Sequence, residues 1–165
     1  MSDPGASDDR SLREVAVAFL SPRGSRDWPP AIDVSTFVAW ATTEGIVGLL
    51  YDRVRRDGAA DHPPPVPPAL LEGLRAGARR QAAMELALRL ELRRLVAAIR
   101  TSGVDLLLMK GASLAYDVYP DPAWRVRCDV DLLIRAADRD TVRACLDDLG
   151  YVEPQVARRL YQFQS

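Results

Sequence analysis

Two aspartates, Asp129 and Asp131, stand two positions apart at the start of an apolar run that ends at Ile134. Side chains alternate between the two faces of a β-strand, so residues i and i+2 share a face, with Cα atoms roughly 6.6 Å apart. Two carboxylates at that spacing repel each other unless a cation lies between them. Mg²⁺ is commonly held by one or two carboxylates plus substrate phosphates, so the pair predicts a magnesium site, with Mn²⁺ as an alternative ion.

A second segment, Lys110-Gly111-Ala112-Ser113, has the chemistry expected of a phosphate site. Glycine lets the backbone approach a ligand, and the free N–H groups of a first helical turn favour an anion. Ser113 adds a hydroxyl donor. Lys110 and Arg125 are suited to neutralising a triphosphate, or else to pairing with nearby aspartates. A Mg²⁺-bound nucleoside triphosphate between the two segments would give the aspartates their cation and the start of the helix its anion.

The elements that must position these residues follow from apolar periodicity. The run 104–110 is too short for a helix and predicts a strand buried on both faces, ended by Gly111, with a short helix beginning at that glycine. A second strand is predicted over 129–135. A helix capped by Asp138 or Asp140 follows and ends at Gly150. The predicted fold is α+β, with an α/β-like core and a small mixed sheet flanked by helices.

The rest of the chain divides by composition. We predict a disordered N-terminus over 1–10, a helical region over 11–56, a proline-rich linker over 57–68, and a long helix plus a partial catalytic core over 69–165. In the helical region, Ser11 is the expected N-cap of the first helix, and a break is expected near Gly45.

Arginines line one side of the predicted long helix, at 75, 79, 80, 89, 93, 94 and 100. Because Glu72, Glu85 and Glu91 are interspersed among them, we interpret this side as a solvated face with a few ion pairs.

Bulk composition narrows the function classes. A net charge of −1 gives no long-range field toward nucleic acid, and no apolar run approaches the roughly 18 residues that span a bilayer. We therefore expect a cytoplasmic protein without a membrane partner. Cys128 and Cys145 are too few and too scattered for a disulfide framework or a zinc site. The 22 basic residues include a single lysine, a bias that indicates a GC-rich, bacterial coding sequence.

The part of the chain from about residue 90 to residue 152 resembles the uncharacterised nucleotidyltransferase family of the polymerase-β superfamily. The resemblance rests on Lys110-Gly111, Tyr119-Pro120-Asp121-Pro122, Arg125 four residues before Asp129-Val130-Asp131-Leu132-Leu133, and Leu149-Gly150-Tyr151. It implies a nucleotidyltransferase that moves a nucleotidyl group from a nucleoside triphosphate to an acceptor hydroxyl. Asp129 and Asp131 would be the catalytic metal ligands, and Gly111 would contact phosphate through its backbone. The acceptor and the oligomeric state are not indicated.

Two features depart from the superfamily pattern. Ala112 separates Gly111 from Ser113, where the more familiar motif has glycine and serine adjacent. The superfamily also completes its site with a third carboxylate on a later strand. Glu153 is the only acid after Asp147-Asp148, and Pro154 behind it disfavours a strand there. We expect either a fragment or an incomplete catalytic site.

Two alternatives stay open. One is a catalytically degenerate module that uses its arginine-rich helices to bind a protein partner. The other, a D-x-D glycosyltransferase, would need a nucleotide-sugar domain longer than the chain allows.

Overall fold

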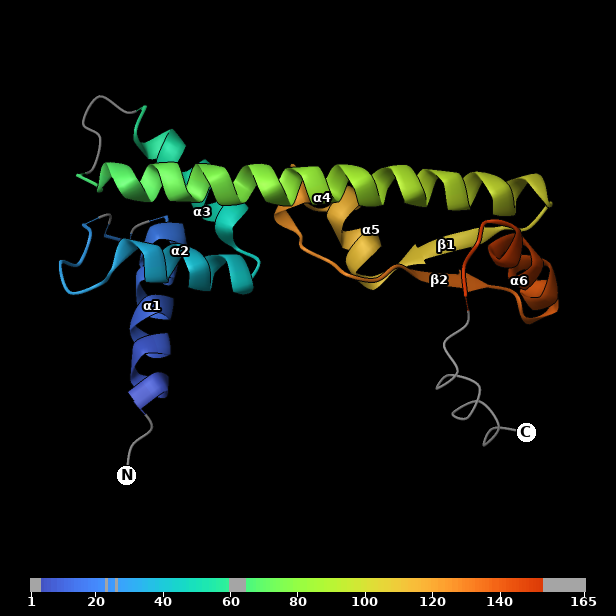
Figure 1. The fold of residues 1–165 in the computed structure, drawn as a ribbon. Coiled ribbons are helices and arrows are strands. Elements are labelled where there is room, and N and C mark those ends of the chain that lie inside the picture. The colour runs from blue at the N-terminus through green and yellow to red at the C-terminus, as the bar shows by residue number, and fades with distance from the viewer. Residues whose placement is uncertain (1–3, 23, 26, 60–64, 153–165) are drawn as a thin grey trace.

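The computed structural model describes residues 4–22, 24–25, 27–59 and 65–152, with the side chains of residues 4–8 not described. One helix, α4, runs the length of the molecule, with α1 to α3 at one end and the strands and α6 at the other (Figure 1). The elements in chain order are α1 (Pro4–Leu20), α2 (Val34–Thr43), α3 (Val47–Asp57), α4 (Pro68–Thr101), β1 (Leu106–Met109), α5 (Lys110–Asp117), the 3₁₀ helix η1 (Pro122–Trp124), β2 (Asp131–Ile134), the 3₁₀ helix η2 (Ala136–Asp138) and α6 (Arg139–Asp148). The predicted α+β class, with helices flanking a small sheet, is confirmed.

The first helix begins earlier than predicted. It starts at Pro4 instead of Ser11, so residues 4–10, which we expected to be disordered, are helical. A tertiary contact accounts for the extension: the Trp40 indole Nε1 donates a hydrogen bond to Asp9 Oδ1 at 2.6 Å. Asp9 also pairs with Arg13 one turn later, at 3.2 Å. The apolar periodicity around Ser11 could not predict this contact, because Trp40 lies on α2.

The predicted break near Gly45 is confirmed. Gly45 has a φ of +72°, a conformation that costs glycine little, and α2 and α3 lie on either side of it. Asp33 caps α2, its Oδ1 accepting the Thr36 N–H at 2.8 Å.

The helical end contains the larger core. Its biggest fully buried side chains are Phe19, Phe37, Val47, Leu50, Leu70 and Leu74. The Trp28 ring packs edge-on against Phe37, with centroids 5.2 Å apart. Each such side chain contributes roughly 1.5–3 kcal/mol by burial, so this cluster fixes the position of the first half of α4.

The sheet has two antiparallel strands, with Leu106 opposite Ile134 and Met109 opposite Asp131. We predicted that 104–110 is buried on both faces, and this is wrong: Leu107 is 63% exposed, and Leu133, on the same face of β2, is 52% exposed. Only the other face is packed, where Leu106, Leu132 and Ile134 meet the small cluster of Leu95, Ile99, Val104 and Val142. Helices cover that face alone, so the strands alternate in burial.

Both strands are also shorter than predicted. β2 begins at Asp131 instead of Asp129 because its partner ends: after Met109 the chain turns directly into α5, so Asp129 and Val130 have no strand opposite them. The alternation of side chains along a strand therefore fixes the face of Asp131, but it does not apply to Asp129, which lies before the strand.

The loop before β2 joins the two ends of the molecule. Asp121 caps η1 by accepting the Ala123 N–H at 2.9 Å, and the Gln81 side chain of α4 donates to the Ala123 carbonyl. The Arg56 guanidinium of α3 lies 6.0 Å from the Trp124 ring centroid. Asp121 therefore shapes η1, and Ala123 and Trp124, which follow the Pro-Asp-Pro motif, anchor the loop to α4 and α3.

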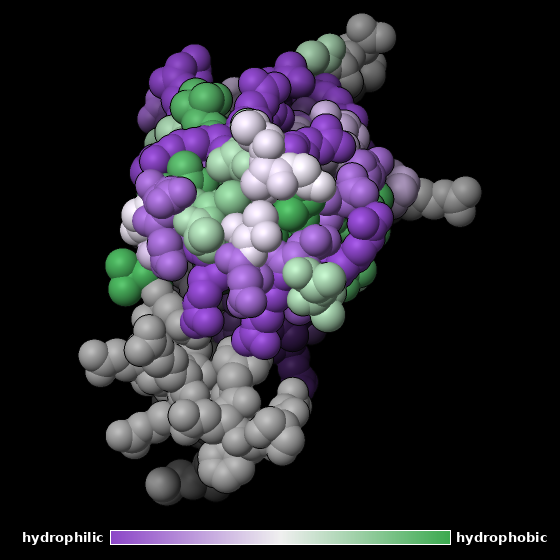
Figure 2. All heavy atoms as spheres, turned by 90° about the vertical axis from the view of Figure 1, so that its right-hand side faces the viewer, coloured by the Kyte–Doolittle hydropathy of each residue, from purple (hydrophilic) through white to green (hydrophobic). Residues whose placement is uncertain are grey.

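At the far end, α6 follows Asp138 as predicted, but the Asp138 side chain makes no capping hydrogen bond. The surface at this end consists mostly of hydrophilic residues, with hydrophobic residues in small separate areas (Figure 2). Among the described residues, no helix combines the length and apolar character that a bilayer crossing requires.

Candidate functional site

Lys110 occupies the junction between β1 and α5. Its backbone has a φ of +47°, the left-handed region that non-glycine residues rarely enter. Its ammonium lies 3.2 Å from Asp131 Oδ1, with the side chains 75% and 37% exposed. We predicted that Gly111 makes this turn, whereas Lys110 carries the positive φ. Strained residues of this kind are concentrated at functional sites.

The start of α5 is open. No side chain caps it, so the N–H groups of its first turn keep their capacity to bind an anion. Gly111 is the second residue of the helix, and a Cβ placed there would come 3.7 Å from Arg127 Cβ, an ordinary contact. The fold has room for a side chain at Gly111.

The two predicted metal ligands, Asp129 and Asp131, differ in their position relative to the sheet. Asp131 is the last residue of the ladder and lies on the open face of the sheet, as its pairing with Met109 shows. Asp129 lies in the exposed loop just before the strand. The ion pair with Lys110 thus places Asp131 beside the start of α5. A common side for both carboxylates stays a prediction, because the ladder does not extend to Asp129.

Ser113 and Arg125 are less closely connected to this point. The Ser113 hydroxyl donates to Asp117 Oδ2 at 2.9 Å, one turn along α5. Arg125 ends η1, where its backbone N–H donates to the Pro122 carbonyl at 3.1 Å, and the residue is exposed. Neither side chain is held toward Asp131 by a contact within the described residues.

The donor set fits a metal ion that shares its ligands with a substrate. Across residues 4–22, 24–25, 27–59 and 65–152, no three His, Cys, Asp or Glu side chains cluster closely enough to hold a metal by themselves. Two carboxylates with access to solvent suit Mg²⁺, which keeps several waters and takes substrate phosphate oxygens. Glu153 and the predicted helix after it lie outside the described residues.

A buried ionic cluster next to this site was not predicted. The Arg127 side chain is only 2% exposed, and its guanidinium lies 2.9 Å from Glu85 of α4 and 4.8 Å from the ring centroid of Tyr116 of α5. Arg127 Nη2 donates to the Tyr116 oxygen at 2.7 Å, and the Tyr116 hydroxyl donates to Glu85 at 3.0 Å. The cluster ties the loop that leads to Asp129 to two helices.

Burial raises the pKa of the Tyr116 phenol above its usual value, and the hydrogen bond to Glu85 adds to the effect. The phenol therefore stays protonated as the donor to Glu85. Two nitrogens of Arg127, Nε and Nη1, are buried without a hydrogen-bond partner among the described atoms. No sequence pattern predicts that Glu85, Tyr116 and Arg127 meet, since they come from distant parts of the chain. In the sequence, nothing distinguishes Arg127 from the other arginines near Asp129.

Comparison with known proteins gives one family match, which covers most of the chain. The model of the family described as "Uncharacterised nucleotidyltransferase" matches residues 30–162, which include α2 to α6 and all the residues of the candidate site. No curated protein and no solved structure gives a significant match. The match covers well over half of the chain, so the chain belongs to the uncharacterised nucleotidyltransferase family.

Proposed function

We propose that this nucleotidyltransferase domain binds a nucleoside triphosphate together with Mg²⁺, or Mn²⁺, and transfers its nucleotidyl group to an acceptor hydroxyl. The observation that carries the proposal is the contact between Lys110 and Asp131, which brings a carboxylate, an ammonium and an uncapped helix start together at one point. A metal-bound triphosphate needs all three kinds of group.

Each residue then has a distinct task. Asp129 and Asp131 would hold the metal ion, which, when bound, neutralises phosphate charge and favours in-line displacement. Lys110 and Arg125 would contact the triphosphate as cations, and the backbone of Gly111 at the start of α5 would donate to it. Ser113 would have to release Asp117 before its hydroxyl could turn toward a phosphate.

The proposed reaction forms a bond between the acceptor oxygen and the α-phosphorus. The bond from that phosphorus to the bridging oxygen breaks, and pyrophosphate leaves with the electron pair. The acceptor proton passes to a base. No third carboxylate joins Asp129 and Asp131 in the described part of the chain, so that base must come from water, from outside the described residues or from a partner.

Isothermal titration calorimetry tests the proposal. We expect binding of at least one of ATP, GTP, CTP and UTP in Mg²⁺, and loss of that heat in EDTA and in the Asp129→Ala/Asp131→Ala variant. Asp148→Ala, which removes an exposed acid at the end of α6, is the matched control and should bind normally. Identical heats for the double variant and the wild type would overturn the proposal.

A noncatalytic module is the second candidate, and the lack of a third acid among the described residues favours it. It predicts no metal-dependent nucleotide binding, and a mass that changes with concentration because a protein partner or a second copy binds. Light scattering over a concentration series, run alongside the calorimetry, distinguishes the two candidates.

A further inference from the structure

A groove of about 690 Å³ runs between the second half of α4 and the β1 and α5 segments. We predicted a solvated arginine face here, and that interpretation is incomplete, because Arg89, Arg93 and Arg100 of α4 line the groove. Its middle is apolar, formed by Leu92, Val96, Ala97 and Leu108, and Tyr116 closes one end. Leu108 points toward α4, so the groove lies on the helix-facing side of the sheet, away from the open face that carries Asp131.

Positive charge in the groove is largely uncompensated. Arg89 is 3.8 Å from Glu85, a carboxylate already engaged by Arg127 at 2.9 Å. Within the described residues, Arg93 and Arg100 take part in no ion pair. An anionic group that enters would therefore meet guanidinium groups free to donate two hydrogen bonds each.

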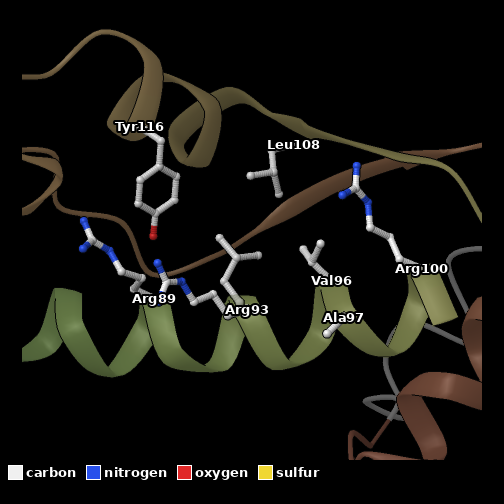
Figure 3. Close-up of a pocket in the computed structure, with 8 residues that line it drawn as sticks. Arg89, Arg93, Val96, Ala97, Arg100, Leu108 and Tyr116 are labelled. Carbon is white, nitrogen blue, oxygen red and sulfur yellow. The ribbon is translucent and has the colours of Figure 1, made fainter.

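The cations stand at the two ends. Figure 3 shows Arg89 and Arg93 beside Tyr116, Arg100 at the opposite end, and Val96, Ala97 and Leu108 between them. The helical rise from Arg89 to Arg100 is about 16 Å, longer than one compact anion can span. A ligand that uses the whole groove must carry negative charge at both ends and apolar groups in the middle.

We propose that this groove binds an extended acidic peptide segment, with two carboxylates four or six positions apart, so that both face the groove, and apolar side chains between them. An extended chain rises about 3.3 Å per residue, so that separation spans roughly 13–20 Å and places one acid near each cationic end. The segment belongs to a protein partner. The site does not depend on the proposed nucleotidyl transfer, since it shares no residue with the candidate site at Asp131.

Calorimetry with synthetic peptides tests the assignment on the full chain. The probe is acetyl-Glu-Ala-Leu-Ala-Val-Ala-Glu-amide, in which both Glu and both larger apolar side chains share one face of an extended chain. One comparison peptide has both Glu replaced by Gln, and a second has the same composition with both Glu at one end. We expect the probe to bind about tenfold more tightly than the Gln peptide and several-fold more tightly than the one-ended peptide, with affinity falling as salt rises.

Variants connect binding to the groove. Arg93→Gln and Arg100→Gln should each weaken binding about fivefold to tenfold, as expected for one charge-assisted contact. Arg80→Gln, an exposed arginine on the first half of α4, is the matched control and should bind as the wild type does. All three positions are exposed, so unchanged circular dichroism and melting temperature are expected and show that the fold is kept.

Three results would overturn the proposal: no binding of the probe, equal binding of the Gln peptide, or equal losses in Arg80→Gln and Arg93→Gln. Metal-free ATP that competes with the probe at comparable affinity would also overturn it, because the groove would then be a site for compact anions. Loss of nucleotide binding in the Asp129→Ala/Asp131→Ala variant should leave peptide binding unchanged, so the two proposals fail separately.

Discussion

The two ends of α4 are built by different means. The helical end packs α1 to α3 on a large apolar cluster, while the sheet end has a smaller cluster of four buried apolar residues and leaves one face of its strands open. At the sheet end, a buried ionic cluster around Arg127 adds contacts that the small core cannot supply. The difference indicates that the helical end provides most of the stability, whereas the sheet end leaves polar side chains such as Lys110 and Asp131 accessible.

The largest effect should come from the core on α4 itself. Leu74→Ala lies in the helical cluster and Leu95→Ala in the sheet cluster, so one substitution on one helix compares the two ends. We expect Leu74→Ala to lower the free energy of unfolding by about 4 kcal/mol and Leu95→Ala by about 2 kcal/mol, because the looser cluster can relax around the missing side chain. Urea denaturation measures both, and equal losses would contradict the contrast.

Breaking the ionic cluster should come next. Arg127→Met leaves the mostly buried Glu85 side chain with only the more distant Arg89 as a cation, and we expect a loss of about 3 kcal/mol. Arg127→Met with Glu85→Leu should recover most of it, because neither charge is then stranded. Thermal unfolding of the single and double variants checks this, and a double variant no more stable than Arg127→Met would argue against a structural ion pair.

A substitution at Gly111 distinguishes a role in folding stability from a role in ligand binding. Since a Cβ at Gly111 meets only an ordinary contact, Gly111→Ala should keep the stability or raise it by up to about 1 kcal/mol. If the first turn of α5 binds phosphate, the same methyl should still weaken nucleotide binding. Melting temperature and calorimetry are read together, and unchanged affinity would remove Gly111 from the site.

The smallest effect concerns the Asp33 cap at the helical end. Hydrogen bonds from Ser35 and Thr36 lower the pKa of Asp33 to about 2. A depressed carboxyl pKa contributes stability above the usual pKa near 3.8 and loses it as pH falls toward 2. Asp33→Ala should therefore be slightly less stable than the wild type at pH 6, and the gap should narrow between pH 4 and 2. A gap independent of pH would contradict the charged cap.

Features that depend on local periodicity were predictable. The long helix, the break at Gly45 and the alternation that puts Asp131 on one face of β2 follow from neighbouring residues alone. The early start of α1 could not be predicted, because it depends on a contact with Trp40, a residue distant in the sequence. The exposure of Leu107 and Leu133 depends on how many layers cover the sheet, which a short apolar run does not encode.

The candidate site was predicted in part. Lys110 and Asp131 follow from their motifs, and the structure joins them across the end of the ladder. The end of the strand was assigned to Gly111 because glycine lets the backbone approach a ligand, whereas the residue with a positive φ at this junction is Lys110. Arg127, Tyr116 and Glu85 lie on three separate elements, so only the folded structure brings them together.

Electron paramagnetic resonance of Mn²⁺ tests the central claim most directly, because it detects the metal without requiring an acceptor. With ATP held below the Mn²⁺ concentration, the wild type should lower the free Mn²⁺ signal beneath the level set by ATP alone, Asp131→Asn should leave it at that level, and Asp148→Asn should behave as the wild type does. Equal loss of the free signal in wild type and Asp131→Asn would contradict a metal site at Asp131.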